Sequence, residues 1–159
     1  MTAIVCADRD WAIGRDNRLL FRISTDLKRF KALTMGHVLL MGRNTFESLP
    51  GLLPGRAHVV LSRDASFAPA GVTVCRTLEE GVAAAQAMGE VFVAGGEIIY
   101  RELLPFCDTA LVTRVDAVAE DADARFPNLD EHPDWRLADA GEWQEEKGLR
   151  FRFCGYRKH

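Results

Sequence analysis

Short apolar runs alternate with amphipathic segments over the first 115 residues. The runs fit buried strands, and the segments between them have helical spacing. This pattern predicts strands at 2–8, 37–41, 57–61, 72–76, 90–94 and 108–115. It predicts helices at 25–35, 43–49, 78–88 and 97–104, the last stopped by Pro105. Alternating strands and helices indicate an α/β fold with a mainly parallel central sheet and helices on both faces.

The last part of the chain has a different pattern. Residues 149–158 alternate apolar and polar side chains, and a second strand-like stretch covers 135–142. We expect these two segments to form an antiparallel strand pair at the C-terminal edge of the sheet, with one face covered. The polar residues 144–148 would link them. Residues 9–22 form a polar, glycine-containing stretch that we expect to be a loop.

Composition excludes several classes of protein. The 159 residues suit a single domain, residues 1–159, with 48% hydrophobic and 27% charged side chains. A net charge of −3 argues against a broad nucleic-acid surface. No basic leader and no apolar run near the ~20 residues of a membrane span is present, so we expect a cytoplasmic protein. The four cysteines and four histidines lack metal-ligand spacing, which favours reduced thiols and no metal.

Asp26 is the most informative candidate for chemistry. On a helix with ~100° per residue, Ile23, Phe30 and Leu33 lie within about 60° of it, so the acid sits on the apolar face. A carboxylate there is costly to bury unless a cationic or hydrogen-bonding ligand meets it. Alternatively, Ser24 or Thr25 caps the helix and Asp26 is a favourable first-turn charge. The two interpretations are compatible.

Three strand ends carry groups suited to phosphates. The first strand end runs into Gly42-Arg43-Asn44-Thr45 before a helix, the second into Ser62-Arg63, and the third into Gly95-Gly96. Backbone N–H groups, hydroxyls and arginines at such ends suit a nucleotide, including the 2′-phosphate of NADP. Each segment alone also fits an ordinary turn with a solvated arginine. The full dinucleotide-binding and phosphate-loop motifs are absent.

Taken in order, these segments form a recognisable set. The set comprises Ile13-Gly14 with Asn17, Asp26-Leu27 with Phe30-Lys31, Met41-Gly42-Arg43 with Thr45-Phe46-Glu47-Ser48, Leu53-Pro54-Gly55-Arg56, Gly95-Gly96 with Tyr100, Thr113, and Phe126-Pro127. It covers essentially the whole chain and resembles the bacterial type of the dihydrofolate reductase family. The resemblance implies NADPH-dependent reduction of 7,8-dihydrofolate to tetrahydrofolate, with hydride transfer to pterin C6 and protonation at N5.

The resemblance also implies roles for individual residues. Asp26 would be the acid of the pterin site, Thr113 would bridge to it, and Arg56 would clamp the glutamate carboxylate. The other substrate-binding residues would be Ile4 and Ala94 through their carbonyls, and Phe21, Leu27, Phe30 and Leu49 as walls. The cofactor-binding residues would be Ile13, Gly14, Leu19, Gly42, Arg43, Thr45, Ser62, Arg63, Gly95 and Gly96. Residues 9–22 would then be a mobile lid, and dihydrofolate and antifolate inhibitors would bind to a monomer.

This chain departs from the family pattern at several positions. Leu20-Phe21 replaces Pro-Trp, which removes an indole N–H that orders a water near the substrate and a proline that stiffens the lid. Glu97 stands where the family has Gly or Ala, and its charge would repel the cofactor phosphates unless it points away. Ala124 replaces the common Thr after Asp123.

Two rival functions remain open from the sequence. One is the related NADPH-dependent reductase of the riboflavin pathway, which reduces a ribosyl-pyrimidine; Arg56 and the spacing from Asp26 to Phe30 favour a pterin with a carboxylate tail instead. The other is a non-catalytic NADP(H)- or folate-binding module. Binding alone would not require Asp26, so its presence favours an enzyme.

Overall fold

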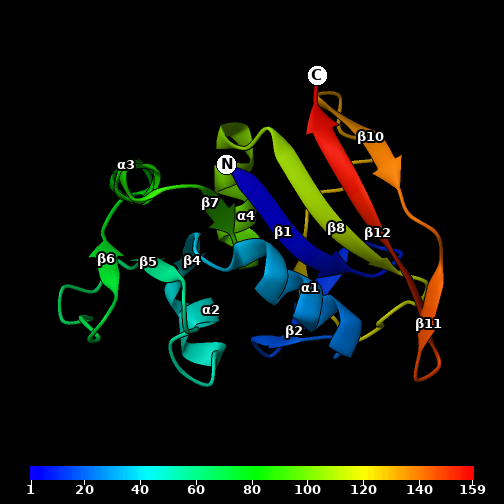
Figure 1. The fold of residues 1–159 in the computed structure, drawn as a ribbon, viewed down its shortest axis with the longest axis horizontal. Coiled ribbons are helices and arrows are strands. Elements are labelled where there is room, and N and C mark those ends of the chain that lie inside the picture. Colours follow the sequence, from blue (N-terminus) through cyan, green and yellow to red (C-terminus); the bar gives the residue numbers. More distant parts are fainter.

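A computed structural model describes residues 1–159, with one large sheet and helices on both of its faces (Figure 1). The strands are β1 (Thr2–Ala7), β2 (Ala12–Arg15), β3 (Arg18–Leu19), β4 (Val38–Gly42), β5 (Ala57–Leu61), β6 (Thr73–Cys75), β7 (Val91–Val93), β8 (Thr109–Val115), β9 (Ala124–Arg125), β10 (Trp135–Ala140), β11 (Gln144–Glu146) and β12 (Leu149–Lys158). The helices are α1 (Ser24–Thr34), α2 (Arg43–Ser48), α3 (Leu78–Met88) and α4 (Glu97–Leu103).

The strand order of the main sheet is β10-β12-β8-β1-β7-β4-β5-β6, with β11 paired to β12. Strands β8, β1, β7, β4, β5 and β6 run parallel, whereas β12 is antiparallel to β8 and β10 is antiparallel to β12. This confirms the α/β class, the mainly parallel sheet and the antiparallel C-terminal pair at its edge.

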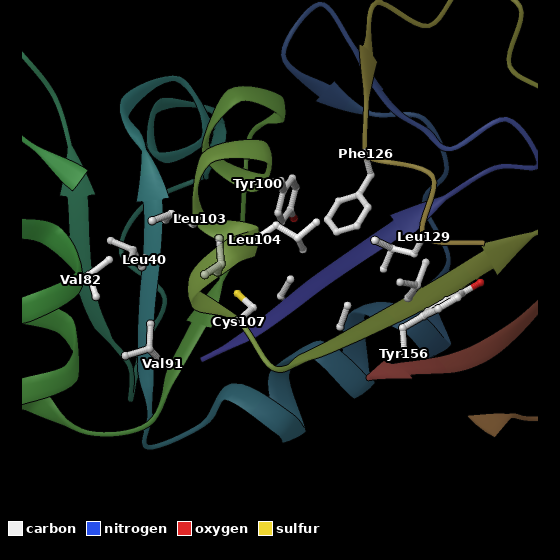
Figure 2. Packing of buried hydrophobic residues seen from close by; sticks show 14 of the residues in the cluster. Leu40, Val82, Val91, Tyr100, Leu103, Leu104, Cys107, Phe126, Leu129 and Tyr156 are labelled. Carbon is white, nitrogen blue, oxygen red and sulfur yellow. The ribbon is translucent and has the colours of Figure 1, made fainter. Parts of the chain in front are cut away.

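The two faces of the sheet have separate cores. On one face, α3 and α4 contribute Val82, Tyr100 and Leu103 to a cluster that includes Leu40 and Val91 (Figure 2). On the other face, alternate residues of the same strands, such as Leu39 and Met41 of β4, pack with side chains of α1 and α2. Residue-by-residue alternation along β4 therefore fills both cores, which explains why this strand is entirely apolar.

The ladder between β1 and β7 ends early. Its last pair is Ala3 with Val93, although β1 continues alongside β8 as far as Ala7. Ile4 and Ala94 are therefore the first residues beyond the ladder on the two strands. The sheet order also reverses here, because β4 to β6 lie on one side of β7 and β8 lies on the other side of β1. Such a switch point is where ligands bind in open α/β sheets.

Two segments expected to be irregular contain strands. Within 9–22, β2 and β3 form a short hairpin, and β2 also pairs with β9. Within 144–148, β11 forms a hairpin with β12, and positive φ angles at Lys147 (51°) and Gly148 (81°) make its turn. Strands this short give too few residues for an alternating apolar pattern, so sequence patterning missed both segments.

The expectation that β12 is covered on one face is wrong. Phe151 packs with Ile23 and Val115 on the α1 side, whereas Cys154 and Tyr156 are buried in the core of the opposite face. Trp11 packs against Tyr156 with ring centroids 5.6 Å apart. Trp11, which lies between β1 and β2 and is far from β12 in sequence, thus covers the second face of β12.

The end of α4 is followed directly by a second short helical segment. The α-helix α4 ends at Leu103, just before Pro105 as expected, and a 3-10 turn at Leu104–Phe106 that includes the proline follows it directly. Proline is compatible with the first positions of such a turn because its missing N–H is not needed there. None of the helices has the length and apolar character required to cross a membrane.

Candidate active site

Asp26 lies in the first turn of α1, facing the carboxyl-terminal parts of β1 and β8. The hydroxyl of Thr113 on β8 donates a hydrogen bond to Asp26 Oδ1 at 2.5 Å. Cys6 of β1 is the register partner of Thr113, and its thiol is close enough to the same carboxylate to act as a second donor. Burial raises the pKa of Asp26, while Thr113, Arg29 and Cys6 oppose that rise. The acid is partly buried beside donors that only partly stabilise its charge.

The expectation that Ser24 or Thr25 caps α1 is wrong. The N-cap residue is Ile23, which offers no side-chain acceptor and is 2% exposed in the core. The carboxylate of Glu146 on β11 takes that place, accepting from Ser24 N at 2.6 Å and Thr25 N at 3.2 Å. The Thr25 hydroxyl also donates to Glu146, at 2.6 Å. Glu146 is 122 positions from Ser24 and 121 from Thr25, so local capping rules could not identify it, which explains the wrong expectation.

Apolar walls surround the end of the β1–β7 ladder. Ile4, Phe30, Leu49 and Ala94 all pack partly buried against one small cluster centred on Leu39, Met41, Val60 and Phe92. Phe21 packs against the neighbouring cluster of Ile23, Val115 and Phe151, and Leu27 is also partly buried on α1. The structure therefore brings the expected apolar residues to the same face of the sheet as Asp26.

The carbonyl of Ile4 lies beside this group because β1 has lost its neighbour there. It accepts a hydrogen bond of 2.7 Å from the hydroxyl of Tyr100 on α4. Tyr100 is 5% exposed, and burial raises the pKa of its hydroxyl. A neutral Tyr100 thus orients this carbonyl, which keeps a second lone pair for another donor.

Arg56 lies next to the C-terminal end of α1. Its guanidinium donates to Thr34 Oγ1 at 3.3 Å and to the Pro54 carbonyl at 3.1 and 3.2 Å. All of these acceptors are neutral, and burial lowers the pKa of Arg56. His58 supports the same loop by accepting from Leu53 N. Since no carboxylate of the chain pairs with Arg56, its charge is available for an acidic ligand.

The glycines expected to bind a cofactor converge with Thr45. Gly42 N donates to Gly95 O at 2.8 Å, which joins the ends of β4 and β7. A Cβ atom at Gly95 would lie 3.3 Å from the Tyr100 ring, and one at Gly96 would lie 3.3 Å from Thr45 Oγ1. Gly95 has φ of +118°, and the Gly95–Gly96 peptide is cis. The positive φ and the nearby Tyr100 ring favour glycine at position 95, and the bare backbone of this turn suits a pyrophosphate.

Arginines gather beyond β4, β5 and β6. Arg43 is paired with Glu47 at 2.9 Å and with Asp64 at 2.8 Å, so the expected phosphate contact is engaged by two acids. Arg63 is exposed and has no ion pair, while Ser62 accepts from Asp64 N. Arg43 follows β4, and Asp64, the residue after Arg63, follows β5. Their ion pair joins the ends of these two strands, which are neighbours in the sheet.

Sequence reasoning missed Arg76, which follows β6. Its guanidinium donates to the carbonyls of Ser62, Asp64 and Ala65. It therefore holds the loop that presents Arg63. The signal was available, since Arg76 follows the strand next to β5 in the same way that Arg63 follows β5.

Residues of the expected lid divide into two groups. Gly14 pairs with Leu19 and Ala124 through β2, and a Cβ at Gly14 would lie 3.1 Å from the Arg18 carbonyl. Ile13 packs against the core, and Asn17 Nδ2 donates to Asn44 O, linking the hairpin to α2. Leu19, however, is 59% exposed. It lines a surface hollow of about 640 Å³ with Leu20 and residues 119–121.

Glu97, the acid expected to disturb cofactor phosphates, points elsewhere. Its carboxylate accepts from Arg125 N at 2.9 Å and lies 3.9 Å from Arg101. The acid thus ties α4 to β9, and β9 in turn pairs with β2 of the lid. Asp123 supports the same segment by accepting from Asp16 N. Ala124 needs no side-chain partner to keep its pairing with Gly14.

The four cysteines are free thiols, and Cys6 is the one that is only partly buried. Burial and the neighbouring Asp26 raise the pKa of Cys6, so the thiol is a donor rather than a nucleophile. No group of three or more His, Cys, Asp or Glu side chains is placed to hold a metal ion.

A mainly parallel sheet with a glycine turn and arginines at its carboxyl edge, and a partly buried acid nearby, defines a nucleotide-dependent α/β enzyme. The family model described as "Dihydrofolate reductase" matches residues 1–158. The chain belongs to the dihydrofolate reductase family.

Individual relatives agree with this assignment. The chain is 43% identical over 152 residues to dihydrofolate reductase of Mycobacterium leprae, covering 92% of this chain and 90% of that protein. It is 35% identical to the Neisseria meningitidis serogroup B enzyme, covering 100% and 98% of the two chains. A solved Enterococcus faecalis dihydrofolate reductase, complexed with NADP(H) and RAB-propyl, has a TM-score of 0.89 at 29% identity, over 99% of this chain and 95% of that one. These likenesses confirm the resemblance stated from the sequence and identify the chain as an enzyme of this family.

Proposed function

We propose that this chain reduces 7,8-dihydrofolate to 5,6,7,8-tetrahydrofolate with NADPH, acting as a single domain over residues 1–159. The observation that carries the proposal is the position of Asp26, a carboxylate whose pKa is raised by burial, among apolar walls at the sheet's switch point. The cofactor supplies a hydride to pterin C6, and a proton must reach N5. We further propose a cytoplasmic monomer whose site also accepts antifolate inhibitors.

Asp26 would hold the pterin through its amino group and ring nitrogen. Thr113 already occupies Oδ1, so the other carboxylate oxygen is the natural acceptor for the ligand. A raised pKa means that Asp26 keeps its proton closer to neutral pH than a solvated acid does. The acid would therefore assist protonation of N5, and turnover would fall as pH rises through the pKa of Asp26.

Apolar side chains would sandwich the rest of the pterin. Ile4, Phe30, Leu49 and Ala94 pack on the same face, Leu27 would join them from α1, and Phe21 would close the site from the lid side. Excluding water in this way strengthens the interaction of Asp26 with the bound heterocycle. Arg56, whose partners are all neutral acceptors, would bind the glutamate carboxylate.

The carboxyl edge of the sheet would hold NADPH. Gly42, Thr45, Gly95 and Gly96 form the crowded turn suited to the pyrophosphate, and Ser62 with Arg63 would meet the 2′-phosphate. Arg43 would have to exchange at least one acid partner for phosphate. Ile13, Gly14 and Leu19 would close over the nicotinamide when the lid moves.

A spectrophotometric assay tests the proposal. Purified protein is mixed with NADPH or NADH, and absorbance is followed with and without dihydrofolate. We expect absorbance to fall only when dihydrofolate is present, and faster with NADPH. NADPH binding without oxidation would instead support a non-catalytic module, and oxidation with a ribosyl-pyrimidine substrate alone would support the riboflavin-pathway rival.

A further inference from the structure

Glu146 connects the C-terminal hairpin to the helix that carries Asp26. It lies on β11, whose partner is β12, and its carboxylate spans the first two amide groups of α1. Hydrogen bonds from Thr25 and Ser24 and the positive charge of Lys147 lower the pKa of Glu146, so its carboxylate is ionised at neutral pH. An ionised carboxylate is the strongest available acceptor for unpaired N–H groups at a helix start.

The same strands hold the first two turns of α1 at three levels. At the start of the helix, Glu146 accepts from Ser24 and Thr25. One residue later, Thr113 of β8 donates to Asp26. In the next turn, the guanidinium of Arg29 lies 4.1 Å from the ring centroid of Phe153 on β12.

These three contacts lie on one continuous support. Phe153 is the register partner of Thr113, and β11 pairs with the preceding part of β12. Rotation or sliding of α1 would therefore break all three contacts together. Of the three, only the Glu146 contact fixes the backbone of the helix directly, through two amide groups.

We propose that Glu146 is a positioning residue of the reaction: from β11 it fixes the start of α1 and thereby the direction of the Asp26 carboxylate toward the pterin. This rests on the proposed function, since it assigns a partner to that same acid. A misplacement of about 1 Å in an active site can cost up to roughly a hundredfold in rate, so a cap at one residue's distance is well placed to matter.

Removal of the cap has a defined effect on pH dependence. The titratable groups that affect the pKa of Asp26 are Cys6 on β1 and Arg29 on α1. The charge of Asp26 in turn affects the pKa of Tyr100 on α4, and Lys147 affects the pKa of Glu146. Without Glu146, the unpaired amides at the start of α1 leave a partial positive charge near Asp26. That charge favours the ionised acid, so the pKa of Asp26 falls.

The test compares Glu146→Ala and Glu146→Gln with the parent and with Glu145→Ala. Glu145 is the neighbouring exposed acid on β11 and makes no bond to α1, which makes it a matched control. We measure kcat and KM for dihydrofolate, the dissociation constant of NADPH, the pH profile and the thermal midpoint. All rates are taken well below the lowest midpoint.

For Glu146→Ala we expect kcat/KM for dihydrofolate to fall about tenfold with NADPH affinity unchanged, and the alkaline limb to move roughly 0.2–0.7 unit to lower pH. Glu146→Gln keeps an acceptor oxygen and should recover part of the loss, while Glu145→Ala should match the parent. A lower thermal midpoint with unchanged kcat/KM and pH profile would overturn the proposal, as would equal losses for both ligands.

Two further measurements keep the result decisive. If Glu146→Ala does not fold, Thr25→Val removes one donor to the same carboxylate, and a normal kcat/KM and pH profile in that variant and in Glu146→Gln would count against the proposal. If the parent itself does not oxidise NADPH with dihydrofolate, the proposed function fails instead, which separates the two hypotheses.

Discussion

Two carboxylates beside β1, those of Asp8 and Asp26, differ in how many hydrogen bonds they accept. Asp8 follows the strand directly and is 0% exposed, yet both of its oxygens are satisfied by backbone N–H groups of Asp10, Ala12 and Ala119. Asp26 reaches the same strand from α1 and receives a single hydroxyl at a defined oxygen, from Thr113, with the Cys6 thiol nearby. Asp8 is the more buried acid, but Asp26 is the one with unused acceptor capacity.

The difference teaches that burial alone does not mark a functional acid. Three backbone donors stabilise a charge that solvent cannot reach, so Asp8 organises the turn at 8–12 and the loop at 116–119. A carboxylate with fewer donors keeps a raised pKa and an open oxygen, both of which a ligand can use.

The arginines repeat the contrast. Arg43 carries two acid partners and lies 4.5 Å over the ring of Phe67, whereas Arg63 is exposed without an ion pair. Asp64, one of those acids, also accepts from Ser66 and has a pKa lowered to about 2. Arg63 thus has no acid competing for its charge, whereas Arg43 would have to release an acid partner before it could bind a phosphate.

The largest effect is expected when Asp26 and Asp8 are each replaced by asparagine and the two variants are compared. Asp26→Asn should lower turnover by roughly 10²–10⁴-fold while NADPH affinity stays near that of the parent. Its stability should not fall, because at neutral pH the ionised acid is unfavourable in the fold and its cost is relieved only as pH drops through the raised pKa.

Asp8→Asn should show the reverse, with stability lower by about 1–3 kcal/mol and the activity of the folded protein retained. The reason is that an amide nitrogen would replace an oxygen that accepts from backbone N–H groups. Steady-state kinetics and urea unfolding of both variants check the pair. Normal turnover in Asp26→Asn would contradict the assigned role of that acid.

A smaller effect is expected at the unpaired arginine. Arg63→Ala should weaken NADPH by about tenfold and leave NADH almost unchanged, because only NADPH has the 2′-phosphate. Titration by fluorescence measures both dissociation constants, with Arg157→Ala, an exposed arginine at the other end of the sheet, as control. Equal weakening of both nucleotides would show that Arg63 does not contact the 2′-phosphate.

The smallest effect concerns the single hydroxyl on Asp26. The hydrogen bond from Thr113 lowers the pKa of Asp26, so Thr113→Val should raise that pKa and move the alkaline limb of the activity profile to higher pH. Turnover at neutral pH should change only a few-fold. Thr113→Ser keeps the hydroxyl and should match the parent profile. An unchanged profile in Thr113→Val would argue against a role for the hydrogen bond.

Sequence patterning predicted the long apolar strands and the helices well, as at β4 and α3, whose burial follows their periodicity. It failed for β2, β3 and β11, which are short and formed by pairing rather than by their own propensity. For the candidate site, the order of motifs gathered Asp26, Thr113 and the Gly95-Gly96 turn. It did not reveal Glu146, which accepts from the backbone of Ser24 far away along the chain. It also did not reveal Arg76, which donates to backbone carbonyls of the loop after β5.

The chain by itself determined the class of fold, the choice of Asp26 as the candidate acid and the positions of the strand-end glycines and arginines, since periodicity and residue type are local properties. Only the tertiary structure decided which charged side chains already have hydrogen-bond or ion-pair partners within the protein. It gave Asp8 three donors, paired Arg43 with two acids, turned Glu97 toward β9 and capped α1 with Glu146. Hydrogen bonds and ion pairs join atoms across loops of any length, so their partners follow from how the strands are ordered and not from sequence spacing.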